Sequence, residues 1–411
     1  MTEASPIEST ADEHVILDAD LLAHPHEFYK MLREQRPVAR VIVPSGIRAW
    51  LVTRHRDVRA ALADPRLAKN SVSVVHLMRR HTDPDKFHNV VKSAAHHMLN
   101  SDPPDHTRLR RLVNRAFTPR GIAQYRPRIE QIADELLDAV AAEVTHTGGE
   151  IDLLDSFAFP LPIAVISELL GVPLDQRDEF REWSNGILSG RPSPTRRYED
   201  LAAYLLDLIR DKRRHPGPDV LSMIVAAEGA DALSDQEALD MVLLLLIAGH
   251  ETTVNLIGNG VLALLRHPEQ LAALRADPTR TPQAVEELLR YDGPFNMATL
   301  RYTTEPVVFS GTTIPAGEFV LVALTSANRD ADQHPDPDRL DIRREGANLA
   351  FGHGIHYCLG APLARLEGEI ALNALLARFP RLGLAREPEE LGWRSGTLVR
   401  GLVELPVRIG P

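Results

Sequence analysis

The residue with the clearest chemical potential is Cys358, the only cysteine in 411 residues. A single cysteine cannot form an internal disulfide or fill a four-thiolate metal site, so its role is structural burial, nucleophilic attack or single ligation of a cofactor. Three glycines, Gly352, Gly354 and Gly360, surround it. Glycine allows a backbone to turn tightly or to approach a flat ligand closely, so these neighbours favour ligation.

The sequence after Cys358 predicts a helix that begins at about Leu359 and continues through Leu376. The cysteine would therefore lie at a helix N-terminus, where free amides and the positive end of the dipole stabilise a thiolate. A thiolate held in this way suits haem iron, because it pushes electron density toward bound dioxygen and favours O–O cleavage. The alternative is a buried, inert cysteine in a glycine-rich loop.

The loop around Cys358 resembles the haem-binding loop of the cytochrome P450 monooxygenases. Their pattern F-x-x-G-x-x-x-C-x-G is matched at Phe351, Gly354, Cys358 and Gly360, and four fixed positions make the match fairly specific. The resemblance covers nearly the whole chain, with its motifs in the right order. It implies a mainly α fold with a small β side (α+β), in which haem b lies between a long central helix and the loop that carries the cysteine ligand.

The composition is that of an ordinary globular protein and excludes several classes. The chain is 44% hydrophobic and 25% charged, and its net charge of -11 argues against nonspecific nucleic-acid binding. The first 14 residues have neither a basic start nor an apolar core, so no secretory signal is expected. The longest apolar run, 241–249, is too short to cross a bilayer. We therefore expect a cytoplasmic protein without a membrane anchor, built as one domain over residues 1–411.

Hydrophobic spacing predicts the elements that position these motifs. Helices are expected at residues 25–35, 54–63, 121–143, 160–170, 176–188 and 198–212, with a proline-rich turn at 189–194. Short strands are expected at 38–43 and 49–53, and a hairpin is expected to pair 307–310 with 319–323. Residues 64–100 show no sustained period, which indicates either a solvated loop or a lid over the site.

The basic segment D-P-P-D-H-T-R-L-R-R carries its charges on two faces. At about 100° per residue, His106 and Arg110 share one helix face, whereas Arg108, Arg111 and Arg115 form a stripe on roughly the opposite face. In the P450 family the His and Arg of such a run contact a haem propionate, so the resemblance gives this role to His106 and Arg110. An exposed charged helix is the alternative, and it explains the stripe better than it explains His106.

The longest helix is expected between a capping box at 234–237 and about residue 266. Its middle is apolar on all sides, which indicates a buried helix. Into this run the sequence places A-G-H-E-T, where a glycine and a threonine weaken the backbone ladder enough for a bulge or a water to insert. Polar residues at such a place need partners or a function.

The A-G-x-E-T run resembles the oxygen-activating segment of the P450 family. The resemblance makes Thr252 and Glu251 catalytic: the hydroxyl hydrogen-bonds the dioxygen being activated, and the carboxylate relays protons from solvent. Ala248 lies one turn before Thr252 on the same face and leaves space beside the hydroxyl. The structural alternative is a hydroxyl bonded back to the carbonyl one turn earlier, with a solvated glutamate.

Further positions follow from the same resemblance. Glu287 and Arg290, together with Arg339, would form a buried structural lock on the haem loop, although E-x-x-R alone is a weak motif. The haem-binding residues that it implies are His106, Arg110, Ala248, Arg301, Phe351, Gly352, His356, Cys358 and Gly360. The substrate-lining residues expected are Val75, Leu77, Leu99, Leu244, Leu245, Ala248, Phe295, Asn296, Met297, Ala298 and Leu398, with Asn296 as the most obvious polar anchor.

The implied reaction inserts one atom of dioxygen into a C–H or C=C bond of an organic substrate, by hydroxylation or epoxidation, and reduces the other atom to water. No flavin or iron–sulfur motif is present in the sequence, so electrons are expected from NAD(P)H through a 2Fe-2S or similar ferredoxin and a ferredoxin reductase. Arg108, Arg111, Arg115 and Arg365 form the expected docking patch for an acidic ferredoxin.

The apolar lining suits a sizeable substrate with few oxygens. A macrolide or other polyketide of secondary metabolism is preferred over a steroid, terpenoid or fatty acid. Two other classes use the same cofactor. An H2O2-dependent peroxygenase would not need the Glu251 and Thr252 relay, whose presence counts against it. A haem sensor usually carries an effector domain, and none is expected in a chain of this length.

Overall fold

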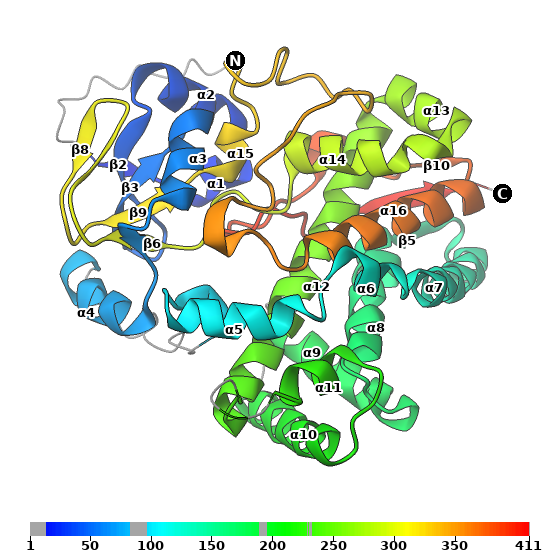
Figure 1. Cartoon of the computed structure of the whole chain (residues 1–411). Helices are drawn as coiled ribbons and strands as arrows, with labels where there is room; N and C mark the ends of the chain where they lie inside the picture. Colours follow the sequence, from blue (N-terminus) through cyan, green and yellow to red (C-terminus); the bar gives the residue numbers. More distant parts are fainter. Residues whose placement is uncertain (1–13, 83–96, 189–194, 228, 230–231, 411) are drawn as a thin grey trace.

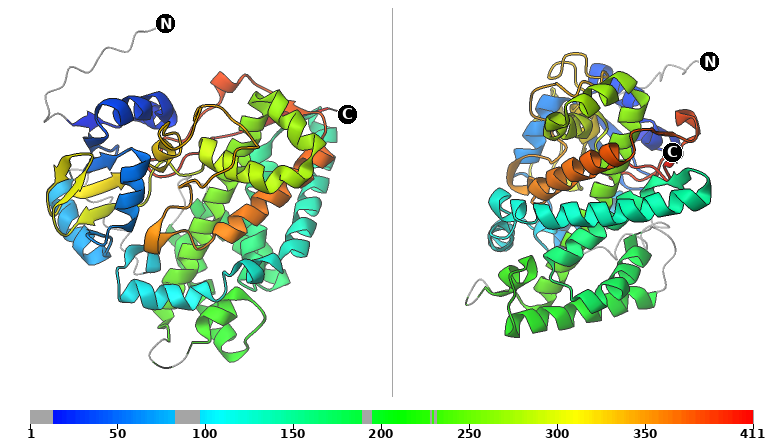
Figure 2. Two further views of the ribbon diagram at one scale, coloured as in Figure 1. Left: turned by 45° about the horizontal axis from the view of Figure 1, so that its top comes forward. Right: turned by 90° about the vertical axis from the view of Figure 1, so that its right-hand side faces the viewer.

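The computed structural model describes residues 14–82, 97–188, 195–227, 229 and 232–410. The larger sheet lies at one side of the molecule, and most of the helices lie at the other, with α12 running through the middle of the helical part (Figures 1 and 2). The chain is therefore mainly helical with small sheets, as the sequence predicts. The first 13 residues and the predicted turn at 189–194 lie outside the described residues.

The main sheet has six strands in the order β1-β2-β3-β9-β6-β4. They span Val15–Ile16 (β1), Val38–Ile42 (β2), Arg48–Val52 (β3), Leu67–Ala68 (β4), Arg301–Thr303 (β6) and Phe319–Val322 (β9). Strands β2 and β3 are antiparallel, as expected for the two predicted strands, and β9 runs parallel to β3. A smaller sheet consists of β10 (Leu382–Leu384), β11 (Pro406–Ile409) and β5 (Glu150–Asp152).

The predicted pairing of residues 307–310 with 319–323 is wrong. Strand β7 (Val307–Phe309) pairs with β8 (Thr312–Ile314) across Ser310 and Gly311, whose φ angles are 46° and 79°. Positive φ at both central residues is typical of two-residue hairpin turns that match the twist of paired strands. Strand β9 joins the main sheet instead, where it pairs with β3 and β6.

The helices include those that spacing predicts and others that it does not, among them α1, α4, α11 and α13. They are α1 (Ala19–Ala23), α2 (Pro25–Gln35), α3 (His55–Ala63), α4 (Ser71–His81), α5 (Asp105–Asn114), α6 (Pro119–Ala123), α7 (Arg126–Thr147), α8 (Pro160–Leu169), α9 (Arg177–Leu188), α10 (Thr195–Arg214), α11 (Val220–Val225), α12 (Asp235–Arg266), α13 (Pro268–Ala276), α14 (Thr281–Asp292), α15 (Leu324–Ala327) and α16 (Ala361–Arg378). The one helix predicted at 121–143 is two, because Pro127 has no N–H to donate and so stands at the start of a new helix.

Residues 64–100 are more regular than their sequence indicates. Helix α4 lies within them, and Val74, Leu77 and Met78 pack against the core on the sheet side. These three residues follow the i, i+3, i+4 spacing of an amphipathic helix, which the surrounding histidines and charges hide. Residues 83–96 of this segment lie outside the described part of the chain.

Helix α12 is the central element of the largest core, and α8, α10, α14 and α16 pack against it. The predicted capping box is present: Glu237 N donates to Ser234 Oγ at 3.1 Å, and Ser234 N donates to the Glu237 carboxylate at 2.9 Å. Among the described helices, only α12 has the length and composition to cross a membrane. However, 67% of its most apolar window is buried inside the protein, as in a core helix.

Candidate active site

The loop before α16 holds the Cys358 sulfur at the wall of a cavity. Cys358 N donates to Phe351 O at 2.9 Å, which closes the loop. Gly354 has a φ of 75°, and a Cβ there would lie 2.7 Å from Leu62 O, so only glycine fits this position. The loop therefore depends on its glycine for both its turn and its close contact with α3.

Burial raises the pKa of the Cys358 thiol, while the N–H groups of Gly360 and Ala361 and the positive charge of Arg110 oppose this effect. Both amides belong to the beginning of α16, as the prediction of a helix N-terminus requires. The sulfur is exposed to the cavity that it lines, although it lies deep in the protein. A thiolate in this position can bind a metal ion that enters the cavity.

The cavity lies between the Cys358 loop and α12, and the space between its lining atoms is about 1430 Å³, counting its open mouth. Most of the lining is aliphatic or aromatic, including Leu244, Leu245 and Phe295. None of the described residues that line the cavity is an aspartate or a glutamate.

One end of the cavity collects five basic side chains: Lys69, His106, Arg110, Arg301 and His356. Burial and the neighbouring positive charges together lower the pKa of His356 to about 2, and burial lowers the pKa of Arg301 to about 10. His106 Nε2 and Arg301 Nε are buried and have no hydrogen-bond partner. These basic groups outnumber the nearby carboxylate of Asp102, and buried charge without a partner is costly, so this end of the cavity fits a ligand that carries carboxylates.

Lys69 is the member of this basic cluster that the sequence did not reveal. It is 3% exposed, and its Nζ donates to Thr299 Oγ1 at 2.6 Å. Burial and the charge of Arg301 hold the pKa of Lys69 well below its usual range. Strand β4 pairs with β6 so that Ala68 is opposite Tyr302, which brings the next residue, Lys69, toward Arg301. This pairing register of β4 with β6 places Lys69 in the basic cluster, and no local sequence pattern predicts the register.

The opposite wall is the middle of α12, where Ala248 and Thr252 line the cavity as the sequence predicts. The Thr252 hydroxyl donates to Ala248 O at 2.8 Å. Thr253 donates in the same way to Gly249 O at 3.0 Å. The helix is continuous from Asp235 to Arg266, so of the two distortions that the sequence allows, a bulge or an inserted water, this described segment shows no bulge. Because the Thr252 hydroxyl donates its proton to Ala248 O, the Thr252 Oγ atom can only accept hydrogen bonds from groups in the cavity.

Glu251 does not line the cavity with Thr252. Its Oε1 accepts a hydrogen bond from Arg394 Nη1 at 3.1 Å, and both side chains are about one-third exposed. The neighbouring His250 is fully buried against Phe159 O, and burial lowers its pKa to about 4. The structural alternative in the sequence analysis expects Glu251 to be solvated. Instead, Glu251 forms an ion pair with Arg394 of the C-terminal segment.

The predicted substrate residues divide into two groups. Those that line the cavity are Leu99, Leu244, Leu245, Ala248, Phe295 and Ala298. Those outside its lining are Val75, Leu77, Asn296, Met297 and Leu398. Asn296 is wrong as a polar anchor, because its buried amide donates to Leu22 O at 3.3 Å. Met297 is fully buried in the core on the sheet side, where Leu77 and Leu398 also pack.

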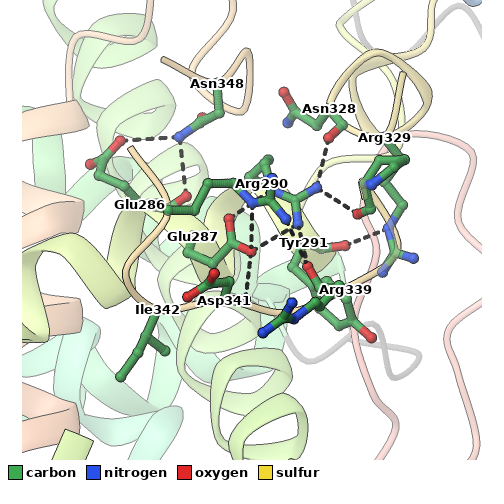
Figure 3. A network of polar contacts seen from close by, with 12 residues as sticks. Glu286, Glu287, Arg290, Tyr291, Asn328, Arg329, Arg339, Asp341, Ile342 and Asn348 are labelled. Atoms are coloured by element: carbon green, nitrogen blue, oxygen red, sulfur yellow. Dashed lines mark hydrogen bonds and ion pairs between the residues drawn. The ribbon is translucent and has the colours of Figure 1, made fainter. Parts of the chain in front are cut away.

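The predicted lock on the haem loop has the right pair and the wrong third residue (Figure 3). Arg290 donates to Glu287 through Nε at 2.7 Å and Nη2 at 2.9 Å, with side chains only 3% and 1% exposed. The second guanidinium at Glu287 belongs to Arg344, whose Nε lies 3.2 Å from Oε1. Arg339 is exposed and offers only its carbonyl to Arg290.

The predicted docking patch is partly engaged in ion pairs. Arg108 pairs with Glu237, and Arg365 pairs with Glu286 and stacks over Phe351. Arg111 on α5 and Arg115 just after it are exposed, and Arg110 on the same helix contacts the Cys358 loop through Tyr357 O at 2.7 Å. The surface near the loop therefore carries positive charge.

A thiolate loop at a helix N-terminus, a basic end and a long helix with Ala248 and Thr252 on the facing wall define a haem-thiolate site. The profile of the family described as Cytochrome P450 matches residues 50–215 and 195–382. The chain belongs to the cytochrome P450 family and is a P450 monooxygenase, whose cofactor is a haem iron.

Relatives match along nearly the full length of the chain. Cytochrome P450 107B1 of Saccharopolyspora erythraea is 51% identical over 94% of this chain and 95% of its own. The vitamin D(3) 25-hydroxylase of Pseudonocardia autotrophica is 47% identical over 97% of each chain. The solved structure of the ligand-free P450 monooxygenase TamI superposes with a TM-score of 0.87 at 46% identity, over 97% of this chain and 95% of that one.

Proposed function

We propose that residues 1–411 form one P450 domain that hydroxylates or epoxidises a sizeable, mostly apolar polyketide, such as a macrolide, in secondary metabolism. The observation that carries this proposal is the apolar cavity that joins Cys358 to Thr252 and ends in a cluster of bases. The proposed cofactor is haem b, with no flavin or iron–sulfur cluster in the chain. The proposed location is the cytoplasm.

The haem would be held by its axial ligand and by its carboxylates. Cys358 would bind the iron, while His106, Arg110, Arg301, His356 and Lys69 would pair with the two propionates. Phe351, Gly352, Gly360 and Ala248 lie where a flat ring can pack between loop and helix. When bound, the haem supplies activation of dioxygen with electrons received one at a time.

Thr252 and Glu251 would manage protons on the α12 side. Thr252 Oγ faces the cavity as an acceptor, so it can receive a hydrogen bond from the group that carries a proton inward from Glu251 and hold that donor in place, while the hydroxyl proton stays in the bond to Ala248 O. The apolar walls would exclude bulk water, which keeps proton delivery to this one route. Glu251 is reached from solvent because its side chain is about one-third exposed.

The substrate class is supported by the lining and by the relatives. One wall of the cavity is apolar and is built from Leu99, Leu244, Leu245, Phe295 and Ala298. Thr299, which follows Ala298, adds a polar side chain to the lining. Relatives are named as a 6-deoxyerythronolide B hydroxylase and as a polyketide biosynthesis P450, and TamI has been solved with tirandamycin C. A secosteroid or a fatty acid is the second candidate, because other relatives are named for vitamin D(3) or were solved with myristic acid.

Two spectroscopic experiments test this proposal. The ferrous protein with carbon monoxide should show the strongly red-shifted Soret band of a haem-thiolate, and its absence in folded, fully loaded protein would refute the cofactor site. Ferric protein should then be titrated with 6-deoxyerythronolide B, tirandamycin C, vitamin D3 and myristic acid. A shift from low to high spin with the first two compounds and not the last two supports a polyketide substrate, and the reverse pattern refutes it.

The proposed electron donors are a ferredoxin and its NAD(P)H-dependent reductase. The exposed Arg111 and Arg115, close to the Cys358 loop, would attract an acidic ferredoxin to the shortest path to the iron. NADH consumption coupled to an oxygenated product in the presence of both partners distinguishes a monooxygenase from a peroxygenase and from a sensor. Product formed only with H2O2, or no product, would refute this part of the proposal.

A further inference from the structure

The C-terminal hairpin (residues 393–402) lies along one stripe of α12. Glu251, Asn255 and Asn259 are spaced four apart on this helix and so share a face. Asn259 Nδ2 donates to Arg400 O at 3.2 Å. A Cβ on Gly401 would lie 2.0 Å from Asn255 Oδ1, so the hairpin backbone touches the helix there. Glu251 completes the stripe through its ion pair with Arg394.

Arg394 is held rigidly within this hairpin. Its backbone N donates to Gly401 O at 2.9 Å, and its Nε donates to Leu402 O at 3.2 Å. The remaining arm of its guanidinium reaches Glu251 Oε1 at 3.1 Å. A guanidinium whose Nε is already bonded to Leu402 O can hold a carboxylate in one place, because few of its own rotamers remain.

We propose that Arg394 is a positioning residue that latches Glu251 against the C-terminal hairpin and thereby limits the delivery of protons toward Thr252. The inference rests on the proposed function, in which Glu251 and Thr252 move protons. In the structure Thr252 faces the cavity, whereas the Glu251 carboxylate is paired with Arg394 outside it. Glu251 must therefore leave Arg394 before it can pass a proton inward.

The latch is weak enough to open during turnover. Its two side chains are 29% and 31% exposed, and ion pairs at such exposure change a conformational equilibrium by no more than about fivefold. The hairpin also reaches the substrate side of the cavity, since Val399 bridges to Phe295 and Asn296 N donates to Leu398 O at 2.8 Å. A molecule that presses on Phe295 therefore acts on the same hairpin that holds Glu251.

The test compares two ways of driving the same reaction in the haem-loaded, full-length enzyme. Styrene epoxidation serves as the probe reaction, because styrene is small and apolar and makes the test independent of the natural substrate. NADH with ferredoxin and reductase requires proton delivery, whereas H2O2 supplies both oxygen and protons. Arg394→Gln should raise the NADH-driven rate by about two- to fivefold, lower its solvent isotope effect and leave the H2O2-driven rate unchanged.

Three further variants complete the design. Arg394→Lys should give an NADH-driven rate between those of wild type and Arg394→Gln, since it keeps the charge but loses the Nε bond to Leu402 O. Arg394→Gln in a Glu251→Gln background should have no effect beyond that of Glu251→Gln alone. Arg386→Gln is the matched control, because Arg386 pairs with Glu404 at similar exposure and in the same C-terminal segment; it should change neither rate.

The outcomes separate the latch from the function on which it rests. An unchanged NADH-driven rate in Arg394→Gln, equal losses in both reactions, or an effect that persists without Glu251 would each overturn the latch. A Glu251→Gln variant with a wild-type NADH-driven rate would overturn the proton relay itself. A red-shifted carbon monoxide band in every variant shows that the haem site is intact, so any change in rate is not a loss of cofactor.

Discussion

Replacing the buried carboxylate of Glu287 should destabilise the protein far more than replacing its exposed neighbour. Glu287 accepts four hydrogen bonds, from Arg290 Nε and Nη2, Arg344 Nε and Asp341 N. Glu287→Gln keeps the shape of the side chain but removes its charge and turns one acceptor into a donor facing Arg290. The guanidinium of Arg290, 3% exposed, would remain buried with only carbonyl oxygens as partners.

The magnitude follows from this burial. Removing one partner of a buried, hydrogen-bonded ion pair costs about 3 to 5 kcal/mol, which is a large part of the 5 to 15 kcal/mol that stabilises a typical protein. Glu286→Gln is the matched control on the same helix. Its carboxylate is 32% exposed and its partner Arg365 is 39% exposed, so the loss should stay below about 1 kcal/mol.

Urea unfolding of the haem-loaded protein, followed by far-UV circular dichroism and by the Soret band, measures both variants. Glu287→Gln should unfold at clearly lower urea and release haem in the same transition, because Arg290 also ties α14 to the segment around Pro337 and Arg339. A loss below about 1 kcal/mol in Glu287→Gln, or equal losses in the two variants, would refute the argument that burial makes this pair essential.

Four further predictions follow from the site. Thr252→Ala should keep the carbon monoxide spectrum but lower the share of NADH that ends in product by at least about tenfold, as measured by product and NADH consumption. Lys69→Met should weaken haem binding by about tenfold, as measured by haem transfer to apomyoglobin, because a charged partner of the propionates is lost. Charge reversal of Arg111 and Arg115 should slow ferredoxin-driven reduction by about tenfold at low salt, and unchanged rates would exclude this docking face. Burial raises the pKa of Glu367 to about 8, so the folded state keeps a proton that the unfolded state loses near pH 4.5. The free energy of unfolding of the wild type should therefore fall as pH rises from about 4.5 to about 8. Because glutamine does not titrate, the stability of Glu367→Gln relative to wild type should increase by about 2 kcal/mol between pH 6 and pH 8, as measured by urea titrations.

Local sequence patterns were sufficient to predict those features of the fold and of the site that are built from residues close together in the sequence. The Cys358 loop, the helix that follows it and the capping box of α12 all depend on residues within a few positions of one another, and all three are present. Helix α4 shows the limit of this approach. Its apolar spacing is short and interrupted by histidine and basic residues, so its order comes from packing on the sheet rather than from its own pattern.

The segment 295–298, which lines part of the cavity, was harder to predict, because it is irregular. Phe295 and Ala298 face the cavity, whereas Asn296 and Met297 are buried away from it. A regular strand would place residues 295 and 297 on one face. Here Phe295 bridges to Val399 and Met297 bridges to Ala323, so the segment twists between two partners that lie far away in the sequence.

Long basic side chains account for the largest gaps between prediction and structure. Arg344 replaces Arg339 at Glu287, Arg394 reaches Glu251, and Lys69 joins the basic end of the cavity. An arginine or lysine side chain spans several residues of irregular chain, so its partner depends on loop geometry that has no sequence period. At Glu287 and at the basic end of the cavity, buried charge reveals these side chains in the structure: a buried charged group needs a partner, which is a long side chain of opposite charge at Glu287 and would be the ligand in the cavity.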